Sequence, residues 1–182
     1  MRLFIGIPLA AKVVNELSEV SLRLRSSGDG LRWSAPESWH ITLQFLGSTG
    51  REQYVCATAR LRELHLPPAP IRLEGLGFFD RTGILYTGVK VSPELLLLHK
   101  QVGEAMALCG FDRETRSFRP HITLARSKAK GEWDVLRELR SEIGSRRKFT
   151  EFVAGEFLLY ESFLGPAGSR YEVRERFFLA AR

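Results

Sequence analysis

Cysteine and histidine are scarce in this sequence, and no apolar stretch is long enough to cross a membrane. The chain has 182 residues, of which two are cysteine and four are histidine. Cys56 and Cys109 lie far apart and outside any C-x-x-C spacing, so we expect two buried free thiols in a reducing cytosol. The apolar run at residues 3–9 is too short for a signal peptide or a membrane span, which predicts a cytoplasmic protein without membrane association.

Several sequence motifs for nucleotide and metal binding are also missing. The chain contains no G-x-x-x-x-G-K-[ST] phosphate loop, no G-x-G-x-x-G and no H-E-x-x-H. These absences disfavour phosphate-loop nucleotidases, dinucleotide-dependent oxidoreductases and zinc proteases of the usual kinds. We therefore expect no cofactor.

Basic residues outnumber acidic ones, 27 to 21, and the formal net charge is +6. The segment 112–130 holds two anions and six cations, which are Arg113, Arg116, Arg119, Arg126, Lys128 and Lys130. This short stretch thus carries +4 of the net charge. A positive field favours a polyanionic partner such as RNA without identifying it. The run at 146–148 is interpreted as a solvated turn.

One tetrapeptide occurs twice. His40-Ile41-Thr42-Leu43 returns as His121-Ile122-Thr123-Leu124, 81 residues further along the chain. The same offset relates Arg32 to Arg113 and the apolar segment around Phe4 to that around Leu85. Units of this length are too few and too long for a solenoid array. We predict a single domain, residues 1–182, built from two internal repeats of about 1–81 and 82–182.

Hydrophobic periodicity predicts an α+β fold with two similar lobes. Strands are expected at 3–7, around each histidine motif, at 71–79 and 84–89, and near the end at 149–162 and 171–180. A helix is expected over 13–24, another from a capping box of Thr49 and Glu52 to about residue 64, and a third from Ser92 and Pro93 to Gly110. A fourth helix would present Trp133, Leu136, Leu139 and Ile143 on one face.

The repeated motif supplies acid–base groups. Strand side chains alternate, so each histidine shares a face with the threonine two residues later. If the two units pack symmetrically, two imidazoles and two hydroxyls meet. One neutral histidine can then activate water, the other can protonate a leaving oxygen, and the threonines can donate to phosphoryl oxygens. A zinc site built on the two histidines would lack a carboxylate or thiol within the motifs, so we expect no metal.

The remaining histidines lack such support. A single H-x-T would be interpreted as structural, whereas two copies at equivalent places favour catalysis. His65 stands at a helix end and His99 in an apolar helix, so both are predicted to be structural or solvated.

Two longer segments carry a family resemblance. RW at 32–33, PE at 36–37 and WHITLQFLG at 39–47 resemble the first motif of the bacterial and archaeal RNA 2′,3′-cyclic phosphodiesterases. FRPHITLAR at 118–126 resembles the second motif. These proteins, first named 2′-5′ RNA ligases (LigT-like), belong to the 2H phosphoesterase superfamily. The opening residues 2–7 and the closing LYES with Gly168 and Tyr171 also fit, so the resemblance spans nearly the whole chain.

The resemblance implies a bilobal fold, with an antiparallel-rich sheet and flanking helices in each lobe and the active-site groove between them. It implies hydrolysis of an RNA terminal 2′,3′-cyclic phosphate to a 2′-phosphomonoester without a metal. By similarity His40 is the proton donor and His121 the proton acceptor. Thr42 and Thr123 hold the phosphate. Arg126 adds a charged contact, which requires the strand to end or bulge after Leu124, because strand alternation alone places Arg126 on the other face.

Two alternatives stay open at this point. The same site could join or cleave 2′-5′ linkages in RNA, or the chain could be a non-catalytic nucleotide-binding module. The expected ligands are RNA ends or cyclic nucleotides, and we expect a monomer with no obligate protein partner.

Overall fold

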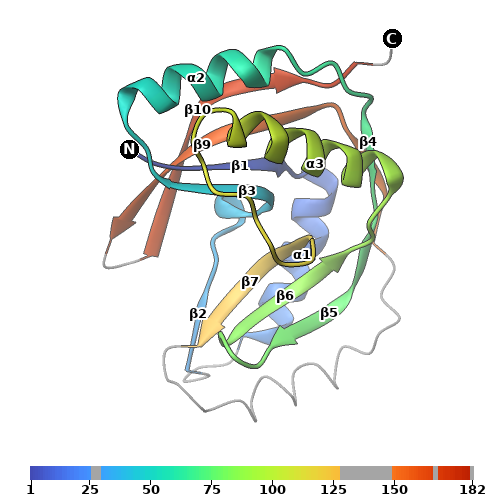
Figure 1. Cartoon of the computed structure of the whole chain (residues 1–182). Helices are drawn as coiled ribbons and strands as arrows, with labels where there is room; N and C mark the ends of the chain where they lie inside the picture. Colours follow the sequence, from blue (N-terminus) through green and yellow to red (C-terminus); the bar gives the residue numbers. More distant parts are fainter. Residues whose placement is uncertain (26–29, 128–148, 166–167, 181–182) are drawn as a thin grey trace.

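The computed structural model describes residues 1–25, 30–127, 149–165 and 168–180 (Figure 1). Three α-helices lie in these ranges: α1 (Ala11–Leu24), α2 (Arg51–Arg62) and α3 (Pro93–Ala107). The strands of the first half are β1 (Arg2–Pro8), β2 (Leu31–Trp33), β3 (His40–Ser48), β4 (Ala69–Ile71) and β5 (Leu73–Phe79). Those of the second half are β6 (Ile84–Val89), β7 (His121–Ser127), β8 (Phe152–Ala154), β9 (Glu156–Gly165) and β10 (Gly168–Phe178). A short 3-10 turn, Pro36–Ser38, precedes β3.

The fold is built on two four-stranded sheets, and each sheet contains strands from both halves of the chain. The first sheet has the order β10-β9-β1-β3 and the second β2-β7-β6-β5, while β4 and β8 form a separate pair. Every pairing recorded among the described strands is antiparallel. Each sheet thus combines strands from both predicted repeats: β2 and β5 join the second sheet, and β9 and β10 join the first. The predicted α+β architecture is confirmed, and the repeat boundary near residue 81 stays a prediction.

Helices cover the sheets from outside. α2 and α3 lie together over the first sheet, and α1 lies behind the second (Figure 1). In α1 the buried Val13, Leu17, Val20 and Leu24 recur at helical spacing, as the sequence predicts. β1 is buried on both faces: Leu3, Ile5 and Ile7 belong to the main core, and Phe4 packs with Leu158 and Tyr160 on the other side.

Of the two predicted N-terminal helix caps, that of α3 is correct and that of α2 is not. Ser92 caps α3, since its Oγ accepts a hydrogen bond from the Leu95 amide at 3.2 Å and Pro93 occupies the first turn. The capping box of Thr49 and Glu52 is wrong: α2 begins one residue later, with Gly50 as its N-cap. The Gly50 amide donates to the Gln53 side chain at 3.3 Å, and the Thr49 hydroxyl donates to the Gly47 carbonyl instead. The predicted helix with Trp133 to Ile143 lies outside the described residues.

The prediction of two free thiols is also wrong, because Cys56 and Cys109 form a disulfide. Cys56 lies in α2, and Cys109 follows the end of α3 instead of lying within that helix. Their Cα atoms are 5.7 Å apart, inside the usual range for a disulfide, although 53 residues separate them in the chain. Only the packing of α2 against α3 brings the pair together, so no sequence spacing could reveal it. The predicted cytoplasmic location stays a prediction.

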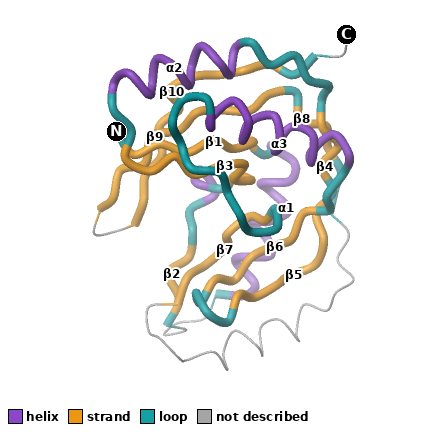
Figure 2. The backbone as a smooth tube through the Cα atoms, in the orientation of Figure 1, coloured by secondary structure: helices purple, strands orange, loops and turns teal. Residues whose placement is uncertain are grey.

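The segment between α3 and β7, residues 108–120, leads from the outer helix layer to the second histidine motif (Figure 2). On its way it passes β3, where the Gln44 amide donates to the Asp112 carbonyl at 3.4 Å. None of the helices in the described part of the chain is long and apolar enough to cross a membrane.

Candidate active site

The two motif strands share one backbone irregularity. β3 pairs with β1, β7 pairs with β6, and in each pairing one residue of the tetrapeptide itself has no partner opposite. This extra residue is Leu43 in β3 and Leu124 in β7, the last residue of each tetrapeptide. Such a bulge shifts the alternation of side chains by one position. Both strands therefore change face at the same point of the repeat.

This bulge decides where Arg126 lies. Up to Leu124 the strand alternates, with His121 and Thr123 half-buried, but the next residue, Ala125, is buried as well. Arg126 therefore returns to the face of His121 and Thr123, which a regular strand would not allow. The predicted condition for Arg126, a bulge after the motif, is confirmed. Phe45 occupies the equivalent place in β3 and is 69% exposed.

Each motif histidine is held by the backbone two residues before it. His40 Nδ1 lies 2.7 Å from the Ser38 carbonyl oxygen, and His121 Nδ1 lies 2.8 Å from the Arg119 carbonyl oxygen. A carbonyl can only accept a hydrogen bond, so Nδ1 carries the proton in both rings. Nε2 is then left with a lone pair in the neutral ring, and it has no hydrogen-bond partner among the described residues.

Aromatic rings pack around both imidazoles, and more closely around the first. The His40 ring lies 4.6 Å from Phe4, 5.2 Å from Tyr171 and 5.7 Å from Tyr160, centroid to centroid. The His121 ring lies 5.0 Å from Phe79 and 5.4 Å from Tyr86. Both rings of the second group contact its histidine edge to face. These contacts restrict the orientation of each imidazole.

Two glycines make room for this packing. A Cβ atom on Gly6, opposite Thr42, would stand 2.9 Å from the Ile41 carbonyl oxygen and 3.3 Å from Cδ2 of His40. In the second sheet Gly77 leaves space for the ring of Tyr86, because a Cβ atom at this position would stand 2.3 Å from that ring. Side chains at either position would displace the histidine or the ring beside it.

The two motifs lie close enough for the charge of His121 to affect the pKa of His40. Burial is the main cause that lowers the pKa of His40, to about 4, and the charges of His121 and Arg126 lower it further. Burial also lowers the pKa of His121, and again Arg126 contributes. The hydrogen bonds to the Ser38 and Arg119 carbonyls act in the opposite direction. β3 and β7 contact each other although they belong to different sheets. Both imidazoles are therefore neutral near pH 7. The positive charge of Arg126 lowers the pKa of both.

Arg32 was not among the predicted site residues; the sequence relates it only to Arg113 through the repeat offset and to the first family motif. It lies directly opposite Arg126 where β2 pairs with β7, and both residues remain accessible to solvent. Partial burial is the main cause that lowers the pKa of Arg126, with the Arg32 charge adding to it and Tyr171 opposing it. Like charges in a cross-strand pair are unfavourable, so an anion between them would relieve a repulsion.

The threonines are placed as the motif predicts. Thr42 and Thr123 are half-buried on the faces of their histidines, and neither hydroxyl has a hydrogen-bond partner within residues 1–25, 30–127, 149–165 and 168–180. Both can therefore donate to a ligand. In the same ranges, no three His, Cys, Asp or Glu side chains gather to form a metal site. The expected lack of a metal stays a prediction.

The other two histidines hydrogen-bond to backbone carbonyls and do not belong to either motif. His65 Nδ1 donates to the Glu63 carbonyl at a helix end, and the half-buried His99 donates to the Leu43 carbonyl. Arg116 pairs with Glu114 and so contributes little free positive charge. Lys128, Lys130 and the run at 146–148 lie outside the described residues.

Comparisons with known proteins concern the family and the fold of the chain. The sequence model of the 2′-5′ RNA ligase superfamily matches residues 10–161. The RNA 2′,3′-cyclic phosphodiesterase of Archaeoglobus fulgidus is 33% identical over 177 residues, covering 94% of this chain and 97% of that protein. The crystal structure of TT0787 of Thermus thermophilus is 28% identical, with a TM-score of 0.76 and 98% of both chains covered. E. coli LigT complexed with 3′-AMP shares the fold, with a TM-score of 0.81 over 99% of this chain and 98% of that one at 23% identity.

Proposed function

Because this chain belongs to the 2′-5′ RNA ligase superfamily, we propose that it hydrolyses the 2′,3′-cyclic phosphate at an RNA end to a 2′-phosphomonoester. The relatives named RNA 2′,3′-cyclic phosphodiesterase, such as that of Archaeoglobus fulgidus, support this activity. The substrate is an RNA end or a cyclic nucleotide.

One observation carries the proposal: two imidazoles with identical backbone anchors offer free Nε2 atoms beside one shared cation. A phosphodiester needs a base on one side of phosphorus and an acid on the other, since its attacking and leaving oxygens lie roughly in line. Two histidines fixed in the same tautomer are suited to these two roles.

In the reaction that we propose, His121 Nε2 takes a proton from water as the water oxygen bonds to phosphorus. The bond between phosphorus and O3′ breaks, and O3′ takes a proton from Nε2 of protonated His40. The products are a free 3′-hydroxyl and a 2′-phosphate. Proton exchange with solvent then returns both histidines to their starting states.

Burial gives His40 a low pKa, so a bound substrate must help to protonate it. A cyclic phosphate diester is an anion, and an anion beside a buried histidine raises its pKa. The anion also offsets the positive charge of Arg126, which lowers the pKa of both histidines. Binding thus raises the protonated fraction of the general acid.

Thr42, Thr123 and Arg126 are proposed to hold the non-bridging oxygens, with Arg32 as a second cation opposite Arg126. These donors can stabilise the charge that builds up on the phosphoryl oxygens in the transition state. Proton transfer and charge stabilisation are then both supplied by side chains, so we propose that no metal takes part.

The test is product analysis on an oligoribonucleotide ending in a 2′,3′-cyclic phosphate, with and without EDTA. We expect a 2′-phosphate end in both cases. A 3′-phosphate end would contradict the assigned leaving group, and activity lost to EDTA and restored by one divalent ion would contradict metal independence. Binding without turnover would identify a nucleotide-binding module.

The superfamily's name favours one second candidate, the joining or cleavage of 2′-5′ linkages. A 5′-hydroxyl in place of water would convert the same site into a ligase. Supplying the cyclic phosphate together with an RNA bearing a 5′-hydroxyl tests this directly, because ligation yields a longer RNA and hydrolysis does not.

A further inference from the structure

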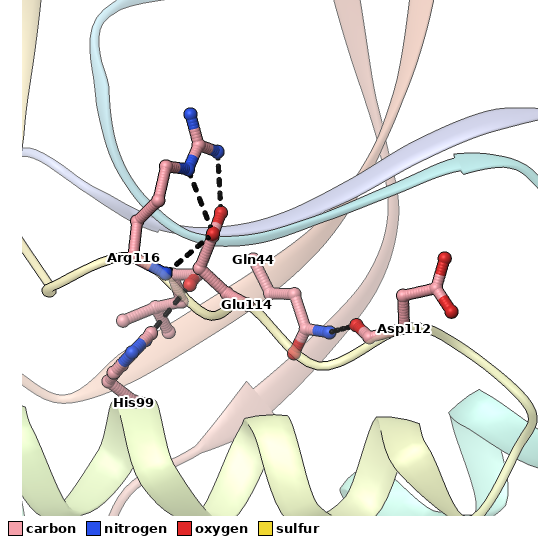
Figure 3. A network of polar contacts seen from close by, with 6 residues as sticks. Gln44, His99, Asp112, Glu114 and Arg116 are labelled. Carbon is pink, nitrogen blue, oxygen red and sulfur yellow. Dashed lines mark hydrogen bonds and ion pairs between the residues drawn. The ribbon is translucent and has the colours of Figure 1, made fainter.

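His99 touches both halves of the active site, although it belongs to neither motif. It lies in α3, and its Nδ1 donates to the Leu43 carbonyl oxygen at 3.0 Å (Figure 3). Its second contact is with Phe118, whose ring stacks on the face of the imidazole at a centroid distance of 3.8 Å and an interplanar angle of 7°. One imidazole thus contacts a backbone carbonyl through its edge and an aromatic side chain through its face.

Each of these contacts leads to one motif histidine. Leu43 is the bulge residue of β3, directly after Thr42 and three residues after His40. Phe118 precedes Arg119, and the Arg119 carbonyl holds Nδ1 of His121. His99 therefore joins the bulge of the first motif to the segment that orients the histidine of the second.

We propose that His99 is a positioning residue that sets the spacing between His40 and His121. The proposal rests on the function proposed above, because spacing matters only if both histidines act on one phosphate. Among the described strands no hydrogen-bonded ladder joins β3 to β7, which lie in different sheets. The backbone joins them only indirectly, where the Ser34 amide, in the segment between β2 and β3, donates to the Leu124 carbonyl of β7 at 2.8 Å. The His99 link is a second connection between the two motifs, made by a side chain.

The helix that carries His99 is anchored at both ends. Ser92 caps its start, and the disulfide between Cys56 and Cys109 ties the residue just past its end to α2. A reference point fixed in this way can hold two motifs at one distance. The link also survives titration, since Nδ1 carries a proton in both the neutral and the charged imidazole.

Replacements of His99 are expected to fold. Its ring borders a cavity of about 190 Å³ whose lining includes Lys100, Glu104, Arg113 and Glu114. A smaller side chain extends this polar space instead of opening a void in an apolar core, the change that is most costly to stability.

Two variants separate the two contacts. In His99→Asn the amide nitrogen can replace Nδ1 as donor to Leu43 while the ring stack is lost. In His99→Phe the stack on Phe118 remains and the donor is lost. Phe118→Leu removes the stack from the other side, and His65→Asn is the matched control, because His65 also donates from Nδ1 to a backbone carbonyl but lies apart from the motifs.

The readouts are kcat and KM for a cyclic mononucleotide, well below the thermal midpoint, and NMR titration of His40 and His121 without ligand. We expect kcat to fall about tenfold in each His99 and Phe118 variant with KM changed less than about threefold, since an ångström of misplacement costs up to about a hundredfold. The His121 titration should shift in His99→Asn, which loses the stack on Phe118, although that substitution does not touch His121. The control should change neither.

Wild-type kcat and unchanged titrations in folded His99 variants would overturn the proposal, as would a lowered thermal midpoint with kcat intact. If the wild-type protein fails to hydrolyse the cyclic phosphate, the proposed function falls. The titration shift then still decides whether His99 couples the two motifs.

Discussion

The surroundings of His40 and His121 differ much more than their backbones do. Both rings bond from Nδ1 to a carbonyl two residues earlier, and both strands bulge at the motif leucine. Three aromatic rings surround His40, whereas two contact His121. Burial accordingly lowers the pKa of His40 to about 4. The position after the bulge differs as well, with Phe45 in one strand and Arg126 in the other.

Two copies of one motif can therefore differ in their surroundings, as the two different roles proposed for His40 and His121 require. The duplicated backbone supplies the orientation that both acid and base need. The neighbours that are not duplicated make the two sites chemically unequal. Burial disfavours a proton on His40, so its proposed role as proton donor depends on the anionic substrate. The two copies thus differ at the residues that determine the local charge and the burial of each histidine.

Removing either imidazole should have the largest effect. His40→Ala and His121→Ala should each lower turnover by about two to four orders of magnitude, the usual contribution of a positioned proton-transfer group. The double variant should be little worse than the worse single one, because groups acting as a unit are not additive. Steady-state kinetics on a cyclic mononucleotide measures this, with His65→Ala as control. A folded single variant at near wild-type rate would show that the repeat is only architecture.

The two positions after the bulge provide the next test. Arg126→Gln should lower kcat/KM about 10- to 100-fold, because a charge-assisted bond to phosphate contributes about 1.5–3 kcal/mol. Phe45→Gln, at the equivalent place in β3, removes no charge, so it should change kcat/KM by less than about threefold. Arg32→Gln should fall between them, with exposed Arg51→Gln as the matched control. Equal losses at 45 and 126 would argue that packing, not charge, matters here.

The pH dependence should separate the free from the occupied site. Both histidines have a lowered pKa without ligand, so the bell-shaped profile of kcat/KM should be centred below pH 6.5. The profile of kcat should lie at higher pH, because the bound anion raises both pKa values. Its limbs report the coupled pair and not single residues. Coincident kcat and kcat/KM profiles would show that the substrate does not change the titration.

Acid stability should give the smallest difference between the two sites. The folded-state pKa of His40 is depressed, so the unfolded chain takes up the proton first and stability falls with pH from about 6.5 to 4. His40→Asn keeps a donor for the Ser38 carbonyl and cannot titrate, so it should remove on the order of 1–3 kcal/mol of this loss. His121→Asn should remove less. Urea unfolding at both ends of this range measures the difference, and equal effects would contradict the unequal burial.

The candidate site was predictable from sequence to a useful degree because its parts are local. A tetrapeptide repeated at one strand position places His40, Thr42, His121 and Thr123, and alternation predicts which of them share a face. Arg126 was predictable only through family resemblance and a condition on the strand. That condition could not be derived, since nothing in the letters around Leu124 specifies a bulge.

Two relations that the sequence missed join distant segments. His99 was predicted to be structural or solvated, and its hydrogen bond to the Leu43 carbonyl and its stack on Phe118 agree with that, but the sequence did not reveal these partners. The free thiols predicted at Cys56 and Cys109 were wrong, because the two residues form a disulfide. Both relations depend on how helices and loops pack, which no spacing rule encodes. The cap of α2 was also mispredicted, but that contact is local, since the Gly50 amide donates to Gln53, three residues later.

The sequence by itself determined which residue types recur and at what spacing, and this pattern is the basis of the proton-transfer and phosphate-binding roles that we propose. Local alternation and periodicity are short-range properties, so they are readable in the order of residues. Only the tertiary structure decided that the two motifs meet, and that β2, β5, β9 and β10 each join a sheet with strands of the other repeat. It also decided that His40 is buried deeply enough to lower its pKa to about 4. Burial and electrostatic coupling depend on distances through space, and those distances exist only once the chain is packed.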